Sequence, residues 1–230
     1  MSSVQIQIQA INLNTDKTLL NDSSYDFDGP GLYILSGRNG SGKSTLLKAI
    51  AGLHTLASGQ ITINGQSIGQ MSVAERAKNI AFAGANAIQE HFITVQDLIQ
   101  VGRSPFEKHW YDLKPDADFH HIVEHLQIQP VLHKSLNAIS DGERQKANIA
   151  RAIYQKTAVL LLDEPTAFLD YPSKVHLFEW LSELAMEQSK IIICSTHDLD
   201  IANRYSKLHL QISEKKLFFF QQAQMQFKGS

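Results

Sequence analysis

The chain has 230 residues, of which 43% are hydrophobic and 19% charged, so it can build the core of one large domain and does not have the composition of a disordered chain. Its 21 basic and 23 acidic residues give a formal net charge of -2, which offers no support for a general nucleic-acid-binding protein. A single cysteine excludes an internal disulfide and favours a reducing compartment. No apolar run approaches the roughly 20 residues that span a bilayer, so we expect a soluble chain whose membrane role comes through a partner.

Strands and helices alternate along most of the chain. Residues 4–8 have the period-two pattern of a strand, and turn residues at 21–24 and 28–31 separate the strands that follow. Further strands are expected at 32–35, 60–63, 158–162, 191–194 and 217–220, and helices at 46–53, 143–155 and 173–187. Strands that are apolar at every position and alternate with helices imply a parallel sheet covered on both faces. We therefore predict an α/β fold, interrupted by a mainly helical insertion at about 87–155.

One segment matches the pattern G-x-x-x-x-G-K-[ST] of a phosphate-binding loop. It consists of Gly37, Arg38, Asn39, Gly40, Ser41, Gly42, Lys43 and Ser44, and the predicted site extends to Thr45. The segment follows a strand and opens a helix, where backbone N–H groups and the helix N-terminus favour a bound phosphate. We expect Lys43 to reach the β- and γ-phosphates of a nucleotide and the Ser44 hydroxyl to bind Mg²⁺.

Two carboxylates, Asp163 and Glu164, follow the apolar strand at 158–162. Ligands of α/β sheets bind at the carboxyl ends of such strands. We expect Asp163 to hold Mg²⁺, directly or through water, and Glu164 to polarise the attacking water as a general base. His197 follows the second apolar strand at 191–194 and is expected within reach of a γ-phosphate.

The order of the motifs is more specific than any one of them. The phosphate loop is followed by Ser140, Asp141, Gly142 and Glu143 before a helix, then by Asp163 and Glu164, then by Phe168, Leu169 and Asp170, and then by His197. Over about residues 4–212 this order resembles the ATP-binding subunits of ABC transporters. The resemblance implies a P-loop nucleotide-binding domain of the ABC type over residues 1–230. It would have a parallel-sheet core, an N-terminal antiparallel β subdomain and an inserted helical subdomain.

The family also implies roles for these residues. It implies a homodimer with two ATP molecules at the interface, in which Ser140, Gly142 and their neighbours contact the γ-phosphate bound by the other subunit. Asp170 would lie at the subunit interface, and His197 would hold the γ-phosphate and the water. We therefore expect hydrolysis of MgATP, with Lys43, Glu164 and His197 as the catalytic residues.

Residues 94–105 resemble the T-V-x-x-L-V-x-x-G-R-x-P stretch of importers for iron-siderophores, haem and cobalamin. This implies import through a separate membrane permease and, indirectly, an external substrate-binding protein. The subunit would lie at the cytoplasmic face of the membrane, with no nucleic-acid partner. Alternatively, Gly102, Arg103 and Pro105 only end a helix and start a loop. Three alternative functions stay open. The chain could serve a different cargo such as metal ions or lipids, or be a poorly hydrolysing regulatory subunit. It could also be a non-transport ABC ATPase acting on nucleic acid or ribosomes.

The chain departs from the family pattern at three places. A glutamine is expected near Ala85, and Gln89 or Asn86 replaces it if any residue does. The stretch 14–17 lacks the aromatic residue that usually stacks on adenine, so we expect weaker or less selective binding of the base. Asp141 stands where glycine is usual, and we expect it to point away from the triphosphate or to cap the following helix.

Overall fold

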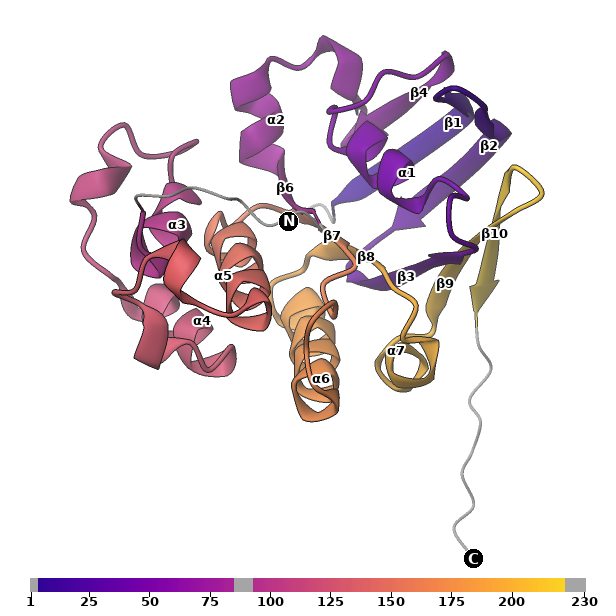
Figure 1. The fold of residues 1–230 in the computed structure, drawn as a ribbon. Coiled ribbons are helices and arrows are strands. Elements are labelled where there is room, and N and C mark those ends of the chain that lie inside the picture. Colours follow the sequence, from indigo (N-terminus) through magenta and orange to yellow (C-terminus); the bar gives the residue numbers. More distant parts are fainter. Residues whose placement is uncertain (1–3, 85–92, 222–230) are drawn as a thin grey trace, which may run out of the picture.

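The computed structural model describes residues 4–84 and 93–221, and its strands form two sheets (Figure 1). The smaller sheet is antiparallel, with the strand order β2-β1-β4-β5. Its strands are β1 (Gln5–Asn14), β2 (Thr18–Asp28), β4 (Ser58–Ile63) and β5 (Gln66–Ser67). The expected N-terminal antiparallel subdomain is confirmed.

The larger sheet has the strand order β10-β9-β3-β8-β7-β6. Its strands are β3 (Gly31–Gly37), β6 (Ile80–Ala83), β7 (Val159–Asp163), β8 (Ile191–Ser195), β9 (Leu208–Ser213) and β10 (Lys216–Gln221). The pairs from β9 to β6 are parallel, whereas β10 pairs antiparallel with β9. The predicted parallel core of an α/β fold is therefore confirmed, with one antiparallel edge strand.

The helices are α1 (Lys43–Ile50), α2 (Val73–Asn79), α3 (Val95–Val101), α4 (Ala117–His125), α5 (Asp141–Tyr154), α6 (Tyr171–Glu187) and α7 (Leu199–Tyr205). Three of them, α3 to α5, lie between β6 and β7 in the chain. Figure 1 shows α3 and α4 at the end of the molecule away from the antiparallel sheet. Across the described residues, none of the helices combines the length and the apolar character that crossing a membrane requires.

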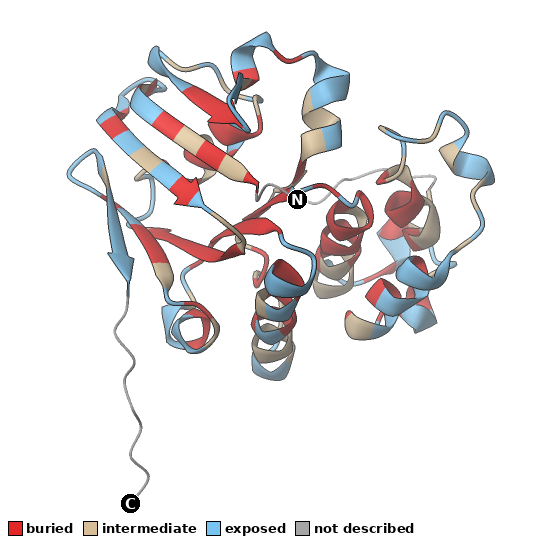
Figure 2. Cartoon of the chain, turned by 180° about the vertical axis from the view of Figure 1, so that it is seen from behind, coloured by how far each residue is buried: buried red, intermediate tan, exposed pale blue. Residues whose placement is uncertain are grey.

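The parallel strands β3, β7 and β8 are buried on both faces, as their uninterrupted apolar sequences predict, whereas the edge strand β10 is mostly exposed (Figure 2). In β3, Leu32 and Ile34 belong to a core shared with α3 to α7. The alternate residues Tyr33 and Leu35 belong to a second core with α1 and the antiparallel sheet. Because successive side chains of a strand point to opposite faces, one short strand contributes to both cores. The sheet thereby holds the carboxyl ends of its strands in fixed positions.

The predicted turn at 21–24 is wrong, because these residues lie within β2. The pairing of β1 with β2 is irregular here: Ile11 pairs with Ser23, register shifts flank this pair, and Asp22 has a φ of 44°. Asparagine and aspartate suit a strand irregularity with positive φ as well as a turn. The reversal lies at residues 15–17, where the Thr15 N–H donates to the Lys17 carbonyl at 2.9 Å.

Gly102 has a packing role at the end of α3. It is the C-cap of this helix, and a Cβ atom on it would overlap the carbonyl oxygen of Arg151 in α5. The absence of a side chain therefore lets α3 approach the backbone of α5 closely. Packing alone therefore explains a glycine at position 102. This agrees with the alternative in which Gly102 only ends a helix and indicates nothing about the cargo.

Candidate nucleotide site

The predicted phosphate loop joins β3 to α1. Gly37 is the last residue of β3, and Gly42 is the N-cap of α1. Gly40 and Gly42 have φ values of 72° and 109°, a region that favours glycine. The Ser41 hydroxyl is buried and has no hydrogen-bond partner among the residues that the structure describes. Because buried hydroxyls are normally paired, a phosphate oxygen seated in this loop would satisfy it.

Three predicted catalytic side chains form a chain of contacts. The Lys43 ammonium donates to the Gly37 carbonyl at 3.0 Å and lies 3.2 Å from Nε2 of His197. The same Nε2 lies 3.1 Å from Oε1 of Glu164. One ring nitrogen cannot accept a hydrogen bond from the lysine and donate one to the carboxylate at the same time. Whether Nε2 of His197 carries a hydrogen therefore decides which of the two neighbours it bonds.

Asp163 lies at the centre of a second cluster. It is buried, and its Oδ1 accepts hydrogen bonds from the Ser44 hydroxyl at 3.0 Å and from the Ser195 hydroxyl at 2.7 Å. The parallel register of β7 with β8 places Asp163 opposite Ser195. The sheet, in which β8 lies between β3 and β7, thus brings the phosphate loop after β3 to the carboxylate of the last residue of β7.

Glu164 adopts an unusual backbone conformation, with a φ of 50°. Its N–H points to Ser195, whose carbonyl and hydroxyl oxygens lie at 3.1 and 3.0 Å. Burial raises the pKa of the Glu164 carboxyl, while the neighbouring His197 and Lys43 oppose this rise and Asp163 adds to it. A carboxyl with a raised pKa is a stronger base when it is ionised.

The segment before α5 forms a capping box. Ser140 is the N-cap of α5: its hydroxyl accepts from the Glu143 N–H at 3.2 Å, and its own N–H donates to the Glu143 carboxylate at 2.8 Å. Asp141 is not the cap that we considered, and its carboxylate instead pairs with Arg144 at 2.8 Å. In the parts of the chain that the structure describes, no hydrogen bond or ion pair joins residues 140–143 to the phosphate loop of the same subunit.

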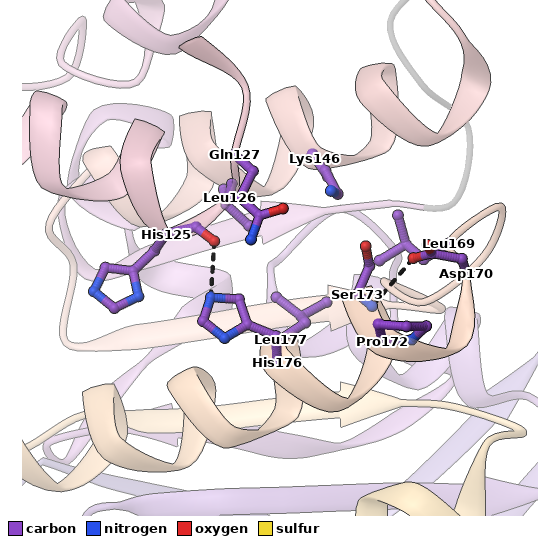
Figure 3. Close-up of a pocket in the computed structure, with 10 residues that line it drawn as sticks. All are labelled: His125, Leu126, Gln127, Lys146, Leu169, Asp170, Pro172, Ser173, His176 and Leu177. Carbon is purple, nitrogen blue, oxygen red and sulfur yellow. Dashed lines mark hydrogen bonds between the residues drawn. The ribbon is translucent and has the colours of Figure 1, made fainter.

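Gly142 lies against the segment that precedes α6. A Cβ atom on it would be 2.8 Å from the carbonyl oxygen of Phe168, a residue that itself has a φ of 64°. Two residues later, Asp170 is the N-cap of α6 and accepts from the Ser173 N–H at 3.1 Å (Figure 3). The hydrogen bonds from Ser173 hold the pKa of the Asp170 carboxyl below its usual value. The structure therefore brings Gly142 close to the segment that carries Asp170.

A pocket of about 320 Å³ adjoins Asp170. Its walls come from the end of α4, from α5, which contributes Lys146, and from the start of α6 (Figure 3). His176 of α6 reaches the carbonyl of His125 in α4 at 3.0 Å across this pocket. None of its lining residues belongs to the phosphate loop, although Asp170 is one of the residues that the family resemblance places at the subunit interface.

A second pocket, of about 280 Å³, lies over the phosphate loop. Its lining residues are Thr15, Lys17, Leu19, Gly40, Ser41, Gly42, Lys43, Ser44 and Thr45. Thr45, to which the predicted site extends, is among these lining residues. The loop residues Arg38 and Asn39 do not line this pocket and are exposed, and the Arg38 carbonyl accepts from the Ser41 N–H at 3.1 Å.

Comparison with known protein families shows to which family the chain belongs. The ABC transporter family matches residues 20–167. The chain belongs to this family. It is 35% identical over 184 residues to the ferric enterobactin transport ATP-binding protein FepC of Escherichia coli strain K12, an alignment that covers 79% of this chain and 68% of FepC. It is 37% identical over 186 residues to the petrobactin import ATP-binding protein FpuC of Bacillus anthracis, covering 80% and 68%.

A solved structure of an ATP-binding subunit of an ABC transporter has the same fold. It superimposes with a TM-score of 0.78 at 23% identity, covering 92% of this chain and 87% of the other. The predicted fold, a nucleotide-binding domain of the ABC type, is therefore confirmed.

The donor set of this ABC domain suits Mg²⁺. The ion prefers hard oxygen ligands and is usually bound by one or two carboxylates together with substrate phosphates. Ser44 and Asp163 supply a hydroxyl and a buried carboxylate within 3.0 Å of each other, next to the phosphate loop. Ser195 would orient the Asp163 carboxylate through its hydrogen bond to Oδ1 without binding the ion itself.

Sequence reasoning missed three site residues. Ser195 orients Asp163 and Glu164, buried Gln145 donates to the Glu164 carbonyl at 3.3 Å, and Lys17 lines the pocket over the phosphate loop. A usable signal existed for Ser195, which directly follows an apolar strand. The signal for Lys17 was its position in the stretch 14–17, where the family resemblance puts the contact with adenine, whereas none existed for Gln145, which lies on a helix. The positions considered for the missing glutamine, Asn86 and Gln89, lie outside the described residues.

Proposed function

We propose that this ABC chain hydrolyses MgATP and powers import of an iron-siderophore or a related large chelate, such as haem or a cobalamin-like substrate, through a separate membrane permease. The observation that carries the chemistry is the meeting of Ser44, Asp163 and Glu164 at the phosphate loop. The cargo class is supported by residues 94–105 and by relatives whose names state transport or import of enterobactin and petrobactin.

The proposed reaction uses the contacts already described. Lys43 and the loop N–H groups bind the phosphates, and Ser44 and Asp163 would hold Mg²⁺, which when bound neutralises phosphate charge. A water oxygen attacks the γ-phosphorus, and the bond between this phosphorus and the β–γ bridging oxygen breaks, so that ADP and phosphate form. Glu164 takes the proton from the water, and His197 positions the carboxylate through its 3.1 Å contact.

A homodimer is part of the proposal. Ser140 and its neighbours are not bonded to the phosphate loop of their own described chain, and Asp170 is exposed at the start of α6. In the proposed dimer, residues 140–143 of each subunit complete the site of the other, and Asp170 lies at the interface. The whole of residues 1–230 would act as one ABC ATPase domain, with residues 87–155 as its helical subdomain.

The location follows from the partner. We place the dimer at the cytoplasmic face of the membrane, held there by the permease, with an external substrate-binding protein acting indirectly. No nucleic-acid partner is proposed.

The test uses tagged Glu164→Gln protein expressed in its own cell and purified with ATP from mildly solubilised membranes. Loss of the base should retain bound ATP and the closed dimer, so mass spectrometry should find a polytopic membrane protein in the preparation. The matched control carries Lys43→Ala as well, which should remove ATP binding and any enrichment that depends on ATP. Recovery only from the soluble fraction, with ribosomal proteins or nucleic acid, would contradict the importer function.

A further inference from the structure

The turn between β1 and β2 lies directly on the phosphate loop. The Leu19 Cβ is 3.0 Å from the position that a Cβ on Gly42 would occupy, and the Lys17 Nζ is 3.7 Å from the corresponding position on Gly40. Lys17 and Leu19 are two residues apart, as are Gly40 and Gly42. Lys17 is the last residue of the reversal before β2, and the buried Leu19 of this strand packs against Gly42, so the chain next to Lys17 is anchored to the loop.

Hydrogen bonds tie this turn to the chain that follows α1. The His54 ring lies 3.1 Å from the Asn14 carbonyl, and the Ala57 N–H donates to the Asn12 carbonyl at 2.9 Å. The Thr15 N–H closes the turn on the Lys17 carbonyl at 2.9 Å. The backbone of Lys17 is therefore held relative to the helix that begins at the phosphate loop.

The side chain of Lys17 is available to a ligand. It is exposed, and within the described ranges no carboxylate lies within 4.0 Å of its ammonium. The adjacent Asp16 carboxylate accepts instead from the Thr15 hydroxyl at 2.7 Å. The residues that line this pocket include no aromatic ring, so nothing among them offers a stacking surface for a base.

We propose that Lys17 is a second phosphate-binding lysine of this site and that it contacts the polyphosphate of the nucleotide rather than its base. This rests on the proposed nucleotide-binding function. Lys43 is buried and lies against Gly37 and His197 on the inner side of the loop, whereas Lys17 approaches Gly40 from the solvent side. Two ammonium groups then flank the loop, and the attraction of the outer one is screened by salt.

The test is isothermal titration of the full chain, in the presence of Mg²⁺, with ATP and separately with inorganic tripolyphosphate, which has no base. Lys17→Gln should lower the affinity for both ligands by the same factor. This factor should be about 5-fold at low salt, which is within the range of a solvent-exposed charge pair. The factor should shrink at high ionic strength, and Lys17→Arg should restore binding. The control is Lys48→Gln, which removes an exposed lysine from the last turn of α1 and should change neither affinity.

The outcomes separate this inference from the proposed function. A wild-type chain that binds neither ligand contradicts nucleotide binding itself. Wild-type binding of both ligands that Lys17→Gln leaves unchanged overturns only the role of Lys17. Weaker binding of ATP with unchanged binding of tripolyphosphate would show that Lys17 contacts the base, which also overturns the proposal.

Discussion

The Ser195 hydroxyl donates a hydrogen bond of 2.7 Å to Oδ1 of Asp163, the same oxygen that accepts from Ser44 at 3.0 Å. Both partners are buried, and the strand register places them opposite each other. The Ser195 oxygen also accepts from the Glu164 N–H at 3.0 Å. One buried hydroxyl therefore orients two successive acidic residues with different proposed roles.

Ser195→Ala should weaken Mg²⁺ binding and slow hydrolysis. Removing a partner that orients a metal-binding carboxylate typically costs about 10-fold or more in metal affinity. The buried Asp163 oxygen would also lose a donor, which should destabilise the fold by about 1–3 kcal/mol. The measurements are the Mg²⁺ dependence of ATP hydrolysis and thermal unfolding.

The control for Ser195→Ala is Ser182→Ala, since the Ser182 hydroxyl donates to the Tyr205 carbonyl at 2.8 Å, away from the site. Equal Mg²⁺ dependence in both variants would contradict the role of Ser195.

The pH dependence of hydrolysis should report Glu164. Burial raises the pKa of its carboxyl, and a base works only when it is ionised. The rate should therefore fall, as the pH is lowered, at a higher pH than an ordinary glutamate would cause. His197 opposes the rise, so His197→Gln should move this acid limb to higher pH. Measuring kcat against pH for both proteins tests this, and an acid limb that does not move would argue against the coupling.

Glu164→Gln should remove the acid limb together with most of the activity. A positioned general base contributes about 10²- to 10⁴-fold to a rate, so a loss of at least about 100-fold is expected. ATP affinity, measured by titration, should stay close to that of the wild-type chain, because Glu164 acts on the water. Hydrolysis at the parental rate would show that another group is the base.

Gly142→Ala should disturb the contact between α5 and the segment before α6. The added methyl group would lie 2.8 Å from the Phe168 carbonyl oxygen, so that backbone must shift. Overpacking of this kind costs about 1–3 kcal/mol, which urea denaturation can measure. Gly69→Ala is the control, because the nearest atom to its added methyl group is the Ser67 hydroxyl at 3.9 Å. Similar stabilities for the two variants would mean that the Phe168 carbonyl yields freely.

The stability of the fold should decrease at mildly acidic pH because of His125. Burial lowers the pKa of its imidazole, with smaller contributions from His121 and His176, and its ring stacks on Trp180 with centroids 4.7 Å apart. With the folded pKa below the unfolded value, the unfolded chain binds more protons between the two values. The stabilisation is complete above the unfolded pKa of about 6.5 and is lost as the pH falls below it.

Thermal unfolding of wild type and His125→Phe at pH 7.5 and 5.5 measures this effect. The phenyl ring keeps an aromatic partner for Trp180 and cannot take a proton, so the drop in Tm on acidification should be smaller in the variant. His133→Phe replaces an exposed histidine and should keep the wild-type drop. An unchanged drop in His125→Phe would locate the sensitivity elsewhere.

The sequence by itself determined the α/β class and the segments from which the site is built. Local patterns sufficed, because a phosphate loop needs glycines at fixed spacing and a strand buried on both faces needs an uninterrupted apolar run. The wrong prediction at 21–24 was also local, because asparagine and aspartate tolerate positive φ in a strand irregularity as readily as in a turn.

Only the tertiary structure decided which side chains meet. The register of β7 with β8 brings Ser195 to Asp163, 32 positions apart in the chain, and the crossover from β3 brings Ser44 to the same oxygen from 119 positions away. The approach of Lys17 to Gly40 depends on the packing of the antiparallel sheet on the phosphate loop. These contacts follow from strand order and packing, which residues distant in the chain determine jointly, so no local pattern specifies them.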